Sequence, residues 1–393
     1  MPGTVIVAGA RTPIGKLSGA LGGFAASELG GFAIAAALER AGVRREQVDY
    51  VLMGQVIQAG AGQITARQAA SNAGIPMDVA ATTINKVCLS GLNAIYLADL
   101  MINAGEADIV VAGGMESMTQ APYLLPGARA GYRIGDGTIV DSMMYDGLFC
   151  AFDNCAMGLG TERYNGSDGV SRERQDAFSA LSHERAARAI KDGRFAEEIV
   201  AVSVPQRKGD PVVIETDEGV RPETTAESLG KLRPAFDKAG TITAGNASQI
   251  SDGGAAVIVM SKAKAEELGV TPLGELVSYG QVAGPSPSLL HQPAHATSVA
   301  LGKAGLSIGD IDIFEINEAF AAVGLASAED LGIDEDRLNV NGGAIALGHP
   351  VGMSGTRLAL TSLLELKRRG GGTAAVSLCG GGGQGDAAVL RSL

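Results

Sequence analysis

The chain has 393 residues, of which 46% are hydrophobic and 19% charged, and its formal net charge is −12. This length predicts two or three domains, and so apolar a composition excludes wholesale disorder. The acidic charge argues against nucleic acid as a partner, because phosphate binding needs a basic surface. Glycine reaches 56 residues while aromatics make up only 4%, which favours close backbone packing over aromatic binding platforms.

The N-terminal residues MPGTVIVAGARTPIG contain no basic segment followed by an apolar stretch, so we expect no secretory signal. No apolar run approaches the ~20 residues of a membrane span, and we expect no membrane partner. The four cysteines, Cys88, Cys150, Cys155 and Cys379, form no evident disulfide framework. Such sparse use of cysteine predicts a reducing, cytoplasmic environment.

Short β-branched runs alternate with helical patterns in the N-terminal part, which is typical of an α/β fold. Buried strands are predicted for TVIVAGA (4–10), YVLMGQV (50–56) and ADIVVAGG (107–114). Helices are predicted over 28–42 and 64–74, and each of them ends at a glycine, as helices often do.

The character of the sequence changes between Thr119 and about Ser248. A weakly periodic stretch rich in Gly, Pro and Met is followed by the charged helical pattern SRERQDAFSALSHERAARAIKDG (171–193). We interpret this segment as an inserted loop domain rather than as part of the central sheet. His183, within the charged helix, is expected to be solvated or to cap the helix.

The first pattern then returns as a near-repeat. Residues 82–117 and 338–385 both run strand, turn, helix, strand and glycine-rich turn. They also share a Ser-Gly pair at the start of the helix, namely Ser90-Gly91 and Ser354-Gly355. Two related α/β halves packed together would place corresponding strand-to-helix junctions near one another.

Reactive side chains occur at these junctions. Cys88, in NKVCLSG, is either a small buried side chain or a nucleophile whose pKa is lowered by the following helix. His349 lies among glycines in ALGHPVG, where core packing explains it poorly, and a nearby histidine can activate a thiol. Cys379 ends an apolar strand before four glycines, whose N–H groups can form an oxyanion site. Because three such residues fall at matched places, we predict that Cys88 is functional.

Two simpler functional motifs are rejected. VIVAGARTPIGKL resembles a phosphate-binding loop, but Ala10 and Leu17 occupy its first Gly and Ser/Thr positions, and Pro13 removes an N–H donor. No GxGxxG follows the first strand, so a dinucleotide site is not predicted either. The chain has no CxxC, and a proline separates the two histidines of LLHQPAH, so we predict no metal site.

These motifs together resemble those of the thiolases, the acetyl-CoA C-acyltransferases. The resemblance covers essentially the whole chain and includes VAGARTPIGK, NKVCLSG, AGGMESM, KLRPAFDKAGTITAGNAS, NEAFA, NGGAIALGHPVGMSG and CGGGGQG. It implies the α/β thiolase fold, in which two similar βαβαβαββ halves form an αβαβα layered core with an inserted loop domain. The expected N-terminal half is 1–118 plus about 249–270, the loop domain for CoA binding and oligomer contacts is 119–248, and the C-terminal half is 271–393.

The resemblance also implies a mechanism. Cys88 would accept the acyl group, His349 would take its proton, and Cys379 would exchange a proton at the α-carbon. The expected reaction is the reversible condensation of two acetyl-CoA to acetoacetyl-CoA and CoA, or thiolysis of a short 3-ketoacyl-CoA. One oxyanion site would use His349 and a water held by Asn317, and the other the N–H groups of Cys88 and Gly381. CoA and acyl-CoA are substrates, so no cofactor is expected, and the family implies a homotetramer.

Contacts to CoA and its acyl group follow from the same resemblance. Arg221 and Ser228 would lie by the nucleotide, although Arg221 can equally be a surface charge partnered by neighbouring acids. Asn317 can likewise be a helix cap rather than a site residue. The pantetheine and acyl tunnel would be lined by Leu148, Met157, Ser248, Ala319 and Phe320.

Three positions depart from the family pattern. Ala156 stands where the short-chain branch often has His, which weakens any transfer of short-acyl specificity. Gly380 follows Cys379 where a larger aliphatic residue is usual, and we expect it to loosen the local pocket. Leu89 replaces the small residue common after the nucleophile, and we expect it to influence which acyl chain Cys88 carries.

Other functions remain open from the sequence. A 3-ketoacyl-CoA thiolase of fatty-acid β-oxidation, with a broader chain range, would use the same residues. A decarboxylating ketoacyl synthase would pair the cysteine with two histidines, whereas this chain has Cys379 where the second base is needed. A non-catalytic thiolase-like acyl-CoA carrier would lack the trio that this chain retains. A simple Cys–His hydrolase would not need Cys379.

Overall fold

The computed structural model describes residues 3–166 and 169–393. A mixed ten-stranded sheet runs through the molecule in the order β14-β15-β16-β13-β1-β12-β5-β3-β4, with β2 (Gly15–Lys16) paired to β12. Its two halves meet where β1 contacts β13, and only Val5–Glu275 and Ile6–Gly274 are paired there. The sheet therefore consists of two halves joined by a narrow seam.

The N-terminal half contains five strands of the sheet: β1 (Thr4–Arg11), β3 (Tyr50–Gly54), β4 (Ala80–Ile84), β5 (Ile109–Ser117) and β12 (Ser251–Ser261). Its helices are α1 (Ala26–Ala41), α2 (Thr65–Asn72), α3 (Ser90–Asn103) and α7 (Lys262–Leu268). The strands and helices predicted in this part are confirmed to within three residues at their ends.

The C-terminal half contains four strands: β13 (Gly274–Ala283), β14 (Ile313–Ile316), β15 (Thr373–Gly380) and β16 (Gln384–Ser392). Its helices are α8 (Gln292–Ala304), α9 (Ala321–Leu331), α10 (Ala344–Leu347) and α11 (Ser354–Arg368). Short 3₁₀ turns cover Arg45–Gln47, Ile308–Asp310 and Glu335–Arg337.

Numbered within each half, the strands follow one order, third-second-fourth-fifth-first, but the third strand of the C-terminal half is reduced to a single bridge between Phe314 and Leu338. The strand predicted to begin at Leu338 is therefore wrong. Asn339 has a left-handed φ of 45°, and its side-chain amide binds both the N–H and the C=O of Ile316 at 2.9 Å. The side chain of Asn339 thus makes the two hydrogen bonds to Ile316 that the backbone of a neighbouring strand would otherwise make.

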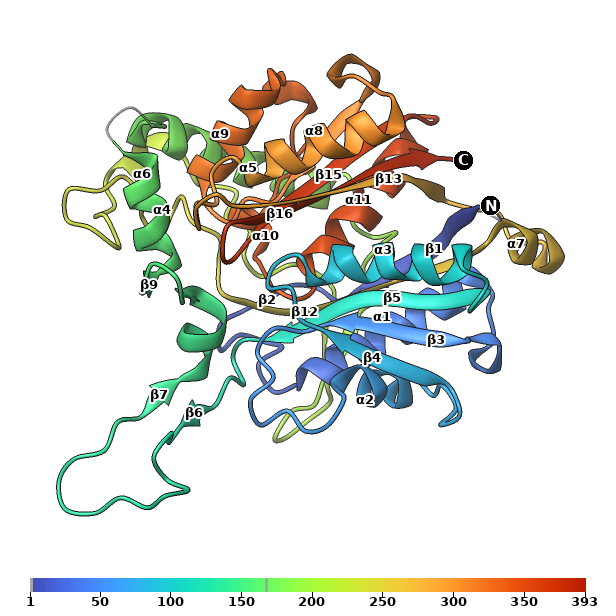
Figure 1. Cartoon of the computed structure of the whole chain (residues 1–393), viewed down its shortest axis with the longest axis horizontal. Coiled ribbons are helices and arrows are strands. Elements are labelled where there is room, and N and C mark those ends of the chain that lie inside the picture. Colours follow the sequence, from blue (N-terminus) through green and yellow to red (C-terminus); the bar gives the residue numbers. More distant parts are fainter. Residues whose placement is uncertain (1–2, 167–168) are drawn as a thin grey trace.

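The helices and the two half-sheets form five layers (Figure 1). α3 and α11 lie between the halves and share one apolar core with both of them. α1 and α2 cover the outer face of the N-terminal half, and α8 and α9 cover that of the C-terminal half. The predicted αβαβα layered core of two similar halves is confirmed.

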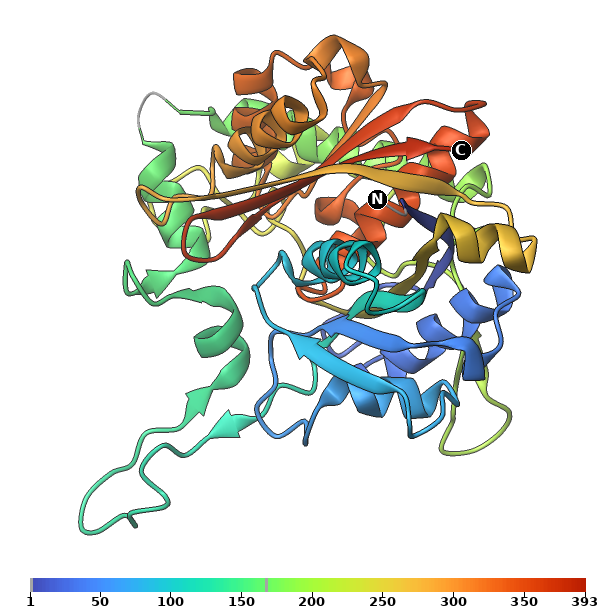
Figure 2. The same ribbon diagram turned by 45° about the vertical axis from the view of Figure 1, so that its right-hand side comes forward.

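The chain between β5 and β12 leaves the core as an arm and then returns. The arm, which projects from the body in Figures 1 and 2, carries β6 (Tyr123–Leu124) and β7 (Val140–Asp141). A π-helical turn, Met143–Leu148, leads into the hairpin of β8 (Phe149–Cys150) and β9 (Cys155–Ala156). Beyond it lie α4 (Met157–Asn165), α5 (Arg172–Lys191), β10 (Val202–Val204), β11 (Val212–Ile214) and α6 (Ala226–Gly230).

The proposed domain limits at 119, 249 and 271 stay a prediction. No helix in the described part of the chain combines the length and apolar character needed to cross a bilayer.

A buried arginine ties this inserted chain to the sheet. Arg11, at the end of β1, is fully buried, and its guanidinium binds Glu198 at 2.7 Å and Asp217 at 2.6 and 2.9 Å. Both carboxylates come from the segment between β5 and β12. The arginine of the VAGARTPIG motif therefore holds the inserted chain against the sheet and does not bind phosphate.

Arg11→Ala should lower the free energy of unfolding by about 3–5 kcal/mol, because it leaves buried carboxylates without a countercharge. Urea denaturation followed by circular dichroism measures the change. Arg174→Ala is the matched control, since it removes only the exposed ion pair with Glu329 and should have little effect. Equal effects of the two substitutions would contradict this account of Arg11.

Candidate active site

Cys88 lies in the turn between β4 and α3, two residues before the helix begins. The turn is closed by Ser90, whose Oγ accepts the N–H of Lys86 at 2.8 Å and donates to the C=O of Val87 at 2.6 Å. Lys86 Nζ pairs with both carboxylate oxygens of Asp386 on β16 at 2.8 Å. The turn that carries Cys88 is thereby fastened to the C-terminal half.

His349 lies in the loop between α10 and α11, and its ring is buried. Its Nδ1 is 2.6 Å from Ser354 Oγ, and the hydroxyl of Ser354 donates to the C=O of Pro350 at 3.1 Å. Because that hydroxyl proton is already used, Ser354 Oγ accepts the proton on Nδ1, which leaves the unprotonated Nε2 as a hydrogen-bond and proton acceptor. Burial, together with the charge of Arg357, lowers the pKa of His349 to about 3. At neutral pH the imidazole is an uncharged base.

Cys379 is the last residue but one of β15, and its side chain is buried. The glycine turn that follows packs on the Cys88 turn, since a Cβ on Gly381 would lie 3.3 Å from Val87 Cγ1. Burial raises the pKa of Cys379, and the charge of Cys88 raises it further, so the two thiols lie close to each other. Val351, two residues after His349, belongs to the same apolar cluster as Cys88. The two cysteines and the loop that carries His349 thus lie next to one another.

The expected lowering of the Cys88 pKa by helix α3 is wrong. Burial raises the pKa of this thiol to about 12, and the carboxylate of Glu116 adds to the effect. Hydrogen bonds from the N–H groups of Cys88 and Gly381 favour the thiolate but do not offset burial. The free-energy cost of removing a thiolate from water is larger than the stabilisation that the N-terminus of a helix provides. The resting group at neutral pH is the thiol.

Glu116, on β5, supports the site but was not predicted to belong to it. Its buried carboxylate accepts the N–H groups of Val56 at 3.0 Å, Ile57 at 3.1 Å and Gly352 at 3.0 Å. Gly352 lies three residues after His349, so one carboxylate fixes two loops around the trio. Burial raises the pKa of Glu116 to about 7. The signal in the sequence is an acidic residue within a strand that is otherwise entirely small or apolar up to that point.

Asn317 follows β14, and its amide Nδ2 is 3.4 Å from His349 Nε2. The alternative of a helix cap is wrong, because α9 begins at Ala321 and its N-cap residue is Phe320. The Oδ1 atom of Asn317 is buried and bonds to no described residue. The amide therefore faces the imidazole and leaves one acceptor open, while its predicted role in holding a water stays a prediction.

The five residues predicted to line the acyl tunnel fall into two groups. One lies in the apolar cluster around Cys88, and the other lies in the cluster that contains Cys379. The first group is Leu148 alone, and the second comprises Met157, Ala319 and Phe320, with Ser248 joined to Ala319 by a 3.0 Å backbone hydrogen bond.

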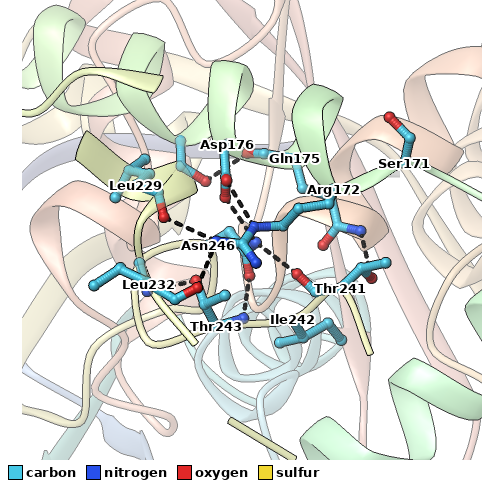
Figure 3. Close-up of polar contacts among 12 residues, drawn as sticks. Ser171, Arg172, Gln175, Asp176, Leu229, Leu232, Thr241, Ile242, Thr243 and Asn246 are labelled. Carbon is cyan, nitrogen blue, oxygen red and sulfur yellow. Dashed lines mark hydrogen bonds and ion pairs between the residues drawn. The ribbon is translucent and has the colours of Figure 1, made fainter. Parts of the chain in front are cut away.

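The first turns of α5 hold the segment that leads to Ser248 (Figure 3). Asp176 accepts the side-chain amide of Asn246 at 3.0 Å and pairs with Arg172 at 2.7 Å. The C=O of Asn246 in turn accepts the N–H of Ala321 at 2.9 Å. The charged helix thereby fixes one wall of the predicted tunnel.

Arg221 is exposed in a loop, and Ser228 is exposed in the short helix α6. The hydroxyl of Ser228 donates to the C=O of Thr225 at 2.8 Å, and no described acid pairs with Arg221. Their predicted contact with the nucleotide stays a prediction. His183 is buried rather than solvated, and its Nδ1 accepts the N–H of Arg221 at 3.1 Å. Burial, with the charge of Arg221, lowers the pKa of His183 to about 4.

Two of the departures from the family pattern complement each other. Leu89 is fully buried, and a Cβ on Gly380 would lie 2.7 Å from its Cγ and Cδ1 atoms. The expectation that Gly380 loosens the pocket is wrong, since Leu89 occupies the space. Leu89 itself lies in the core shared by α3 and α11 rather than in the cluster around Cys88. Ala156, the third departure, is half-buried in β9.

The part of the chain that the structure describes holds no group of three or more His, Cys, Asp or Glu side chains arranged to bind a metal.

Known proteins resemble this chain over its full length. Residues 4–263 match the family model for the thiolase N-terminal domain, and residues 270–392 match that for the thiolase C-terminal domain. A probable acetyl-CoA acetyltransferase of Mycolicibacterium smegmatis is 60% identical over 387 residues, which is 98% of this chain and 100% of the relative. One of Mycobacterium tuberculosis is 57% identical and the acetyl-CoA acetyltransferase of Cupriavidus necator 53%, each over 100% of both chains.

Alkylation of Cys88 by iodoacetamide should accelerate about tenfold per pH unit from about pH 7 to 9, because its pKa near 12 keeps the thiolate fraction rising. Peptide mass spectrometry measures the rate at this residue, and Cys88→Ser confirms the assignment of the peptide. A rate that levels off below about pH 8 would mean that the thiolate is already formed.

Gly380→Val should destabilise the fold by about 1–3 kcal/mol through overlap with Leu89. Leu89→Ala should cost about 2–5 kcal/mol by leaving a cavity. In the double variant the new side chain fills part of that cavity, so its loss should be smaller than the sum of the two. Urea unfolding measures all three variants, and strictly additive losses would disprove the contact.

Proposed function

Since this chain belongs to the thiolase family, we propose that it is an acetyl-CoA C-acetyltransferase, which condenses two acetyl-CoA to acetoacetyl-CoA and CoA and also catalyses the reverse thiolysis. The observation that carries the proposal is that the Cys88 turn, the loop with His349 and the end of β15 with Cys379 lie next to one another. The names of relatives that are 53–60% identical supply the substrate.

Acylation uses the neutral imidazole. Cys88 Sγ attacks the thioester carbonyl of acetyl-CoA while Nε2 of His349 takes the thiol proton. The N–H groups of Cys88 and Gly381 donate to the oxygen on which negative charge develops. Collapse of this intermediate breaks the bond to CoA, and the imidazolium returns its proton to the departing sulfur. The acetyl group is left on Cys88.

Condensation then needs a strong base at an α-carbon. Nε2 of His349 takes the thiol proton of Cys379, and the raised pKa of this thiol makes the resulting thiolate basic enough to remove the weakly acidic α-proton. The resulting enolate is stabilised by Nε2–H of His349 and a water bound to Asn317, and its carbon attacks the acetyl group. Cys88 leaves as a thiolate and takes the proton from Nε2 of His349, while Cys379 keeps the α-proton as its thiol. The thioester itself activates the α-carbon, so no metal or redox cofactor is part of the proposal.

A functional test follows each half-reaction. With acetyl-CoA, the Cys88 peptide should gain one acetyl group, and Cys88→Ser should gain none. Cys379→Ala should still be acetylated but should exchange no α-proton and form no acetoacetyl-CoA. Acetylation without condensation in the unmodified enzyme would support a non-catalytic carrier instead, and unimpaired thioester hydrolysis by Cys379→Ala would support a hydrolase.

Chain length is decided by turnover with CoA across 3-ketoacyl-CoA substrates from four to sixteen carbons. We expect the rate to fall steeply beyond the shortest members. Equal turnover along the series would replace the proposed activity by that of a broad-range β-oxidation thiolase. A cytoplasmic location stays a prediction from the sparse, unpaired cysteines.

We also propose a homotetramer. β4 is an edge strand whose unpaired backbone suits a second copy, and the arm exposes Tyr123, Leu125, Ile134 and Ile139. Light scattering should give about four times the 39.8 kDa chain mass. Replacing 126–138 by a short glycine linker should yield dimers, and a monomeric full chain would refute the proposal.

Ser354→Ala should lower kcat about tenfold with little change in KM, because the proton on Nδ1 of His349 loses its acceptor and the basic nitrogen is no longer fixed. Ser362→Ala on the same helix is the control, since that hydroxyl donates only to the C=O of Leu358 at 2.8 Å. Steady-state kinetics of the two variants decide, and equal kcat values would rule out the orienting role of Ser354.

A further inference from the structure

The β8–β9 hairpin places two cysteines opposite each other. Cys150 and Cys155 are register partners in its antiparallel ladder, and residues 151–154 form the tip. Directly opposite residues have Cα atoms about 4.5–5.5 Å apart, and disulfides span about 4.4–6.8 Å. Both side chains are buried free thiols. The backbone of this hairpin is therefore already compatible with a cross-strand disulfide.

The two sulfur atoms also lie on the same side of the hairpin, as opposite residues of a ladder do. Cys155 Sγ would be 3.6 Å from a Cβ on Gly160 of α4, and Cys150 lines a small cavity that Gly160 also borders. Cys150 Sγ accepts the N–H of Asp153 at 3.4 Å, which holds the sulfur over the hairpin. The missing side chain at Gly160 leaves room for both sulfur atoms.

The hairpin connects the surroundings of the two catalytic cysteines. Leu148, just before it, packs in the cluster around Cys88, and Met157, just after it, packs in the cluster that contains Cys379. At the tip, Phe152 contacts the glycine turn, since a Cβ on Gly382 would lie 2.8 Å from its Cε2 atom. A change in the hairpin would therefore be felt on both sides of the site.

We propose that Cys150 and Cys155 form a reversible disulfide that locks this hairpin. A low-molecular-weight disulfide, RSSR, is the oxidant. One cysteine thiolate attacks a sulfur of RSSR, the S–S bond breaks, and one RSH is released. The second cysteine attacks the protein sulfur of the mixed disulfide and releases a second RSH. Two protein thiols are oxidised to one disulfide, and RSSR is reduced to two RSH.

The lock acts on substrate entry rather than on chemistry. A disulfide would hold the two strands of the hairpin together. Leu148 and Met157 flank the hairpin, and the acyl-CoA is proposed to pass between them, so these two residues could no longer move apart. This consequence rests on the proposed function, whereas formation of the disulfide does not. Oxidation should therefore raise KM for acetoacetyl-CoA several-fold and leave kcat nearly unchanged.

The test exposes the purified full-length enzyme to graded oxidised glutathione, blocks remaining thiols with iodoacetamide and maps the unreduced peptides. We expect a Cys150–Cys155 disulfide within one peptide and a rise in KM that dithiothreitol reverses. The variant Cys150→Ser/Cys155→Ser should keep its KM under the same treatment. Any loss of activity that this variant does show belongs to Cys88 or Cys379 and is subtracted.

Separate glutathione adducts on the two cysteines, or a disulfide confined to Cys88 and Cys379, would overturn the proposal. An unchanged KM after complete Cys150–Cys155 oxidation would overturn the locking role. If the double variant does not fold, the peptide map of the unsubstituted chain still decides whether the disulfide forms. An enzyme that maps as expected but turns over no acetoacetyl-CoA would refute the proposed function alone.

Discussion

The active site depends on the close crossing of α3 and α11 between the two half-sheets. A Cβ on Gly91 would lie 2.7 Å from Thr356 Oγ1, and one on Gly355 would lie 2.4 Å from the backbone nitrogen of Leu92. Glycine at both positions lets the helix backbones touch, and Thr356 Oγ1 donates to the C=O of Gly91 at 3.0 Å. α3 begins two residues after Cys88 and α11 begins five residues after His349, so the crossing influences how near the nucleophile comes to its base.

Burial then decides the protonation states in that narrow space. The imidazole of His349 is held neutral, and both thiols are held protonated, because no charged form is well solvated there. Charge is created only when a thioester is present to receive it, next to donors that are already in position. A dry site with fixed N–H groups therefore stabilises the transition state more than the resting state.

Much of this arrangement could be predicted from the sequence, because it is encoded locally and repeated. The matching Ser-Gly pairs indicated two equivalent helix starts, and the residues near them were Cys88 and His349. What could not be predicted depends on partners distant in the chain. The three N–H groups that donate to Glu116 come from two loops far apart in the chain, and the complementarity of Leu89 and Gly380 exists only where β15 meets α3. Asn339 makes backbone-like hydrogen bonds with its side chain, and the hydrophobic periodicity of the sequence gives no sign of this.

The narrow seam between the half-sheets has a consequence for how the molecule unfolds. With only Val5–Glu275 and Ile6–Gly274 paired across it, the sheet itself contributes little to holding the halves together. The packing of the inner helices and the ion pair of Lys86 with Asp386 hold the two halves together instead. Opening the seam would strip the apolar faces of α3 and α11 at the same time as it separates the catalytic groups. Cooperative stability and catalytic geometry thus depend on the same buried contact between α3 and α11.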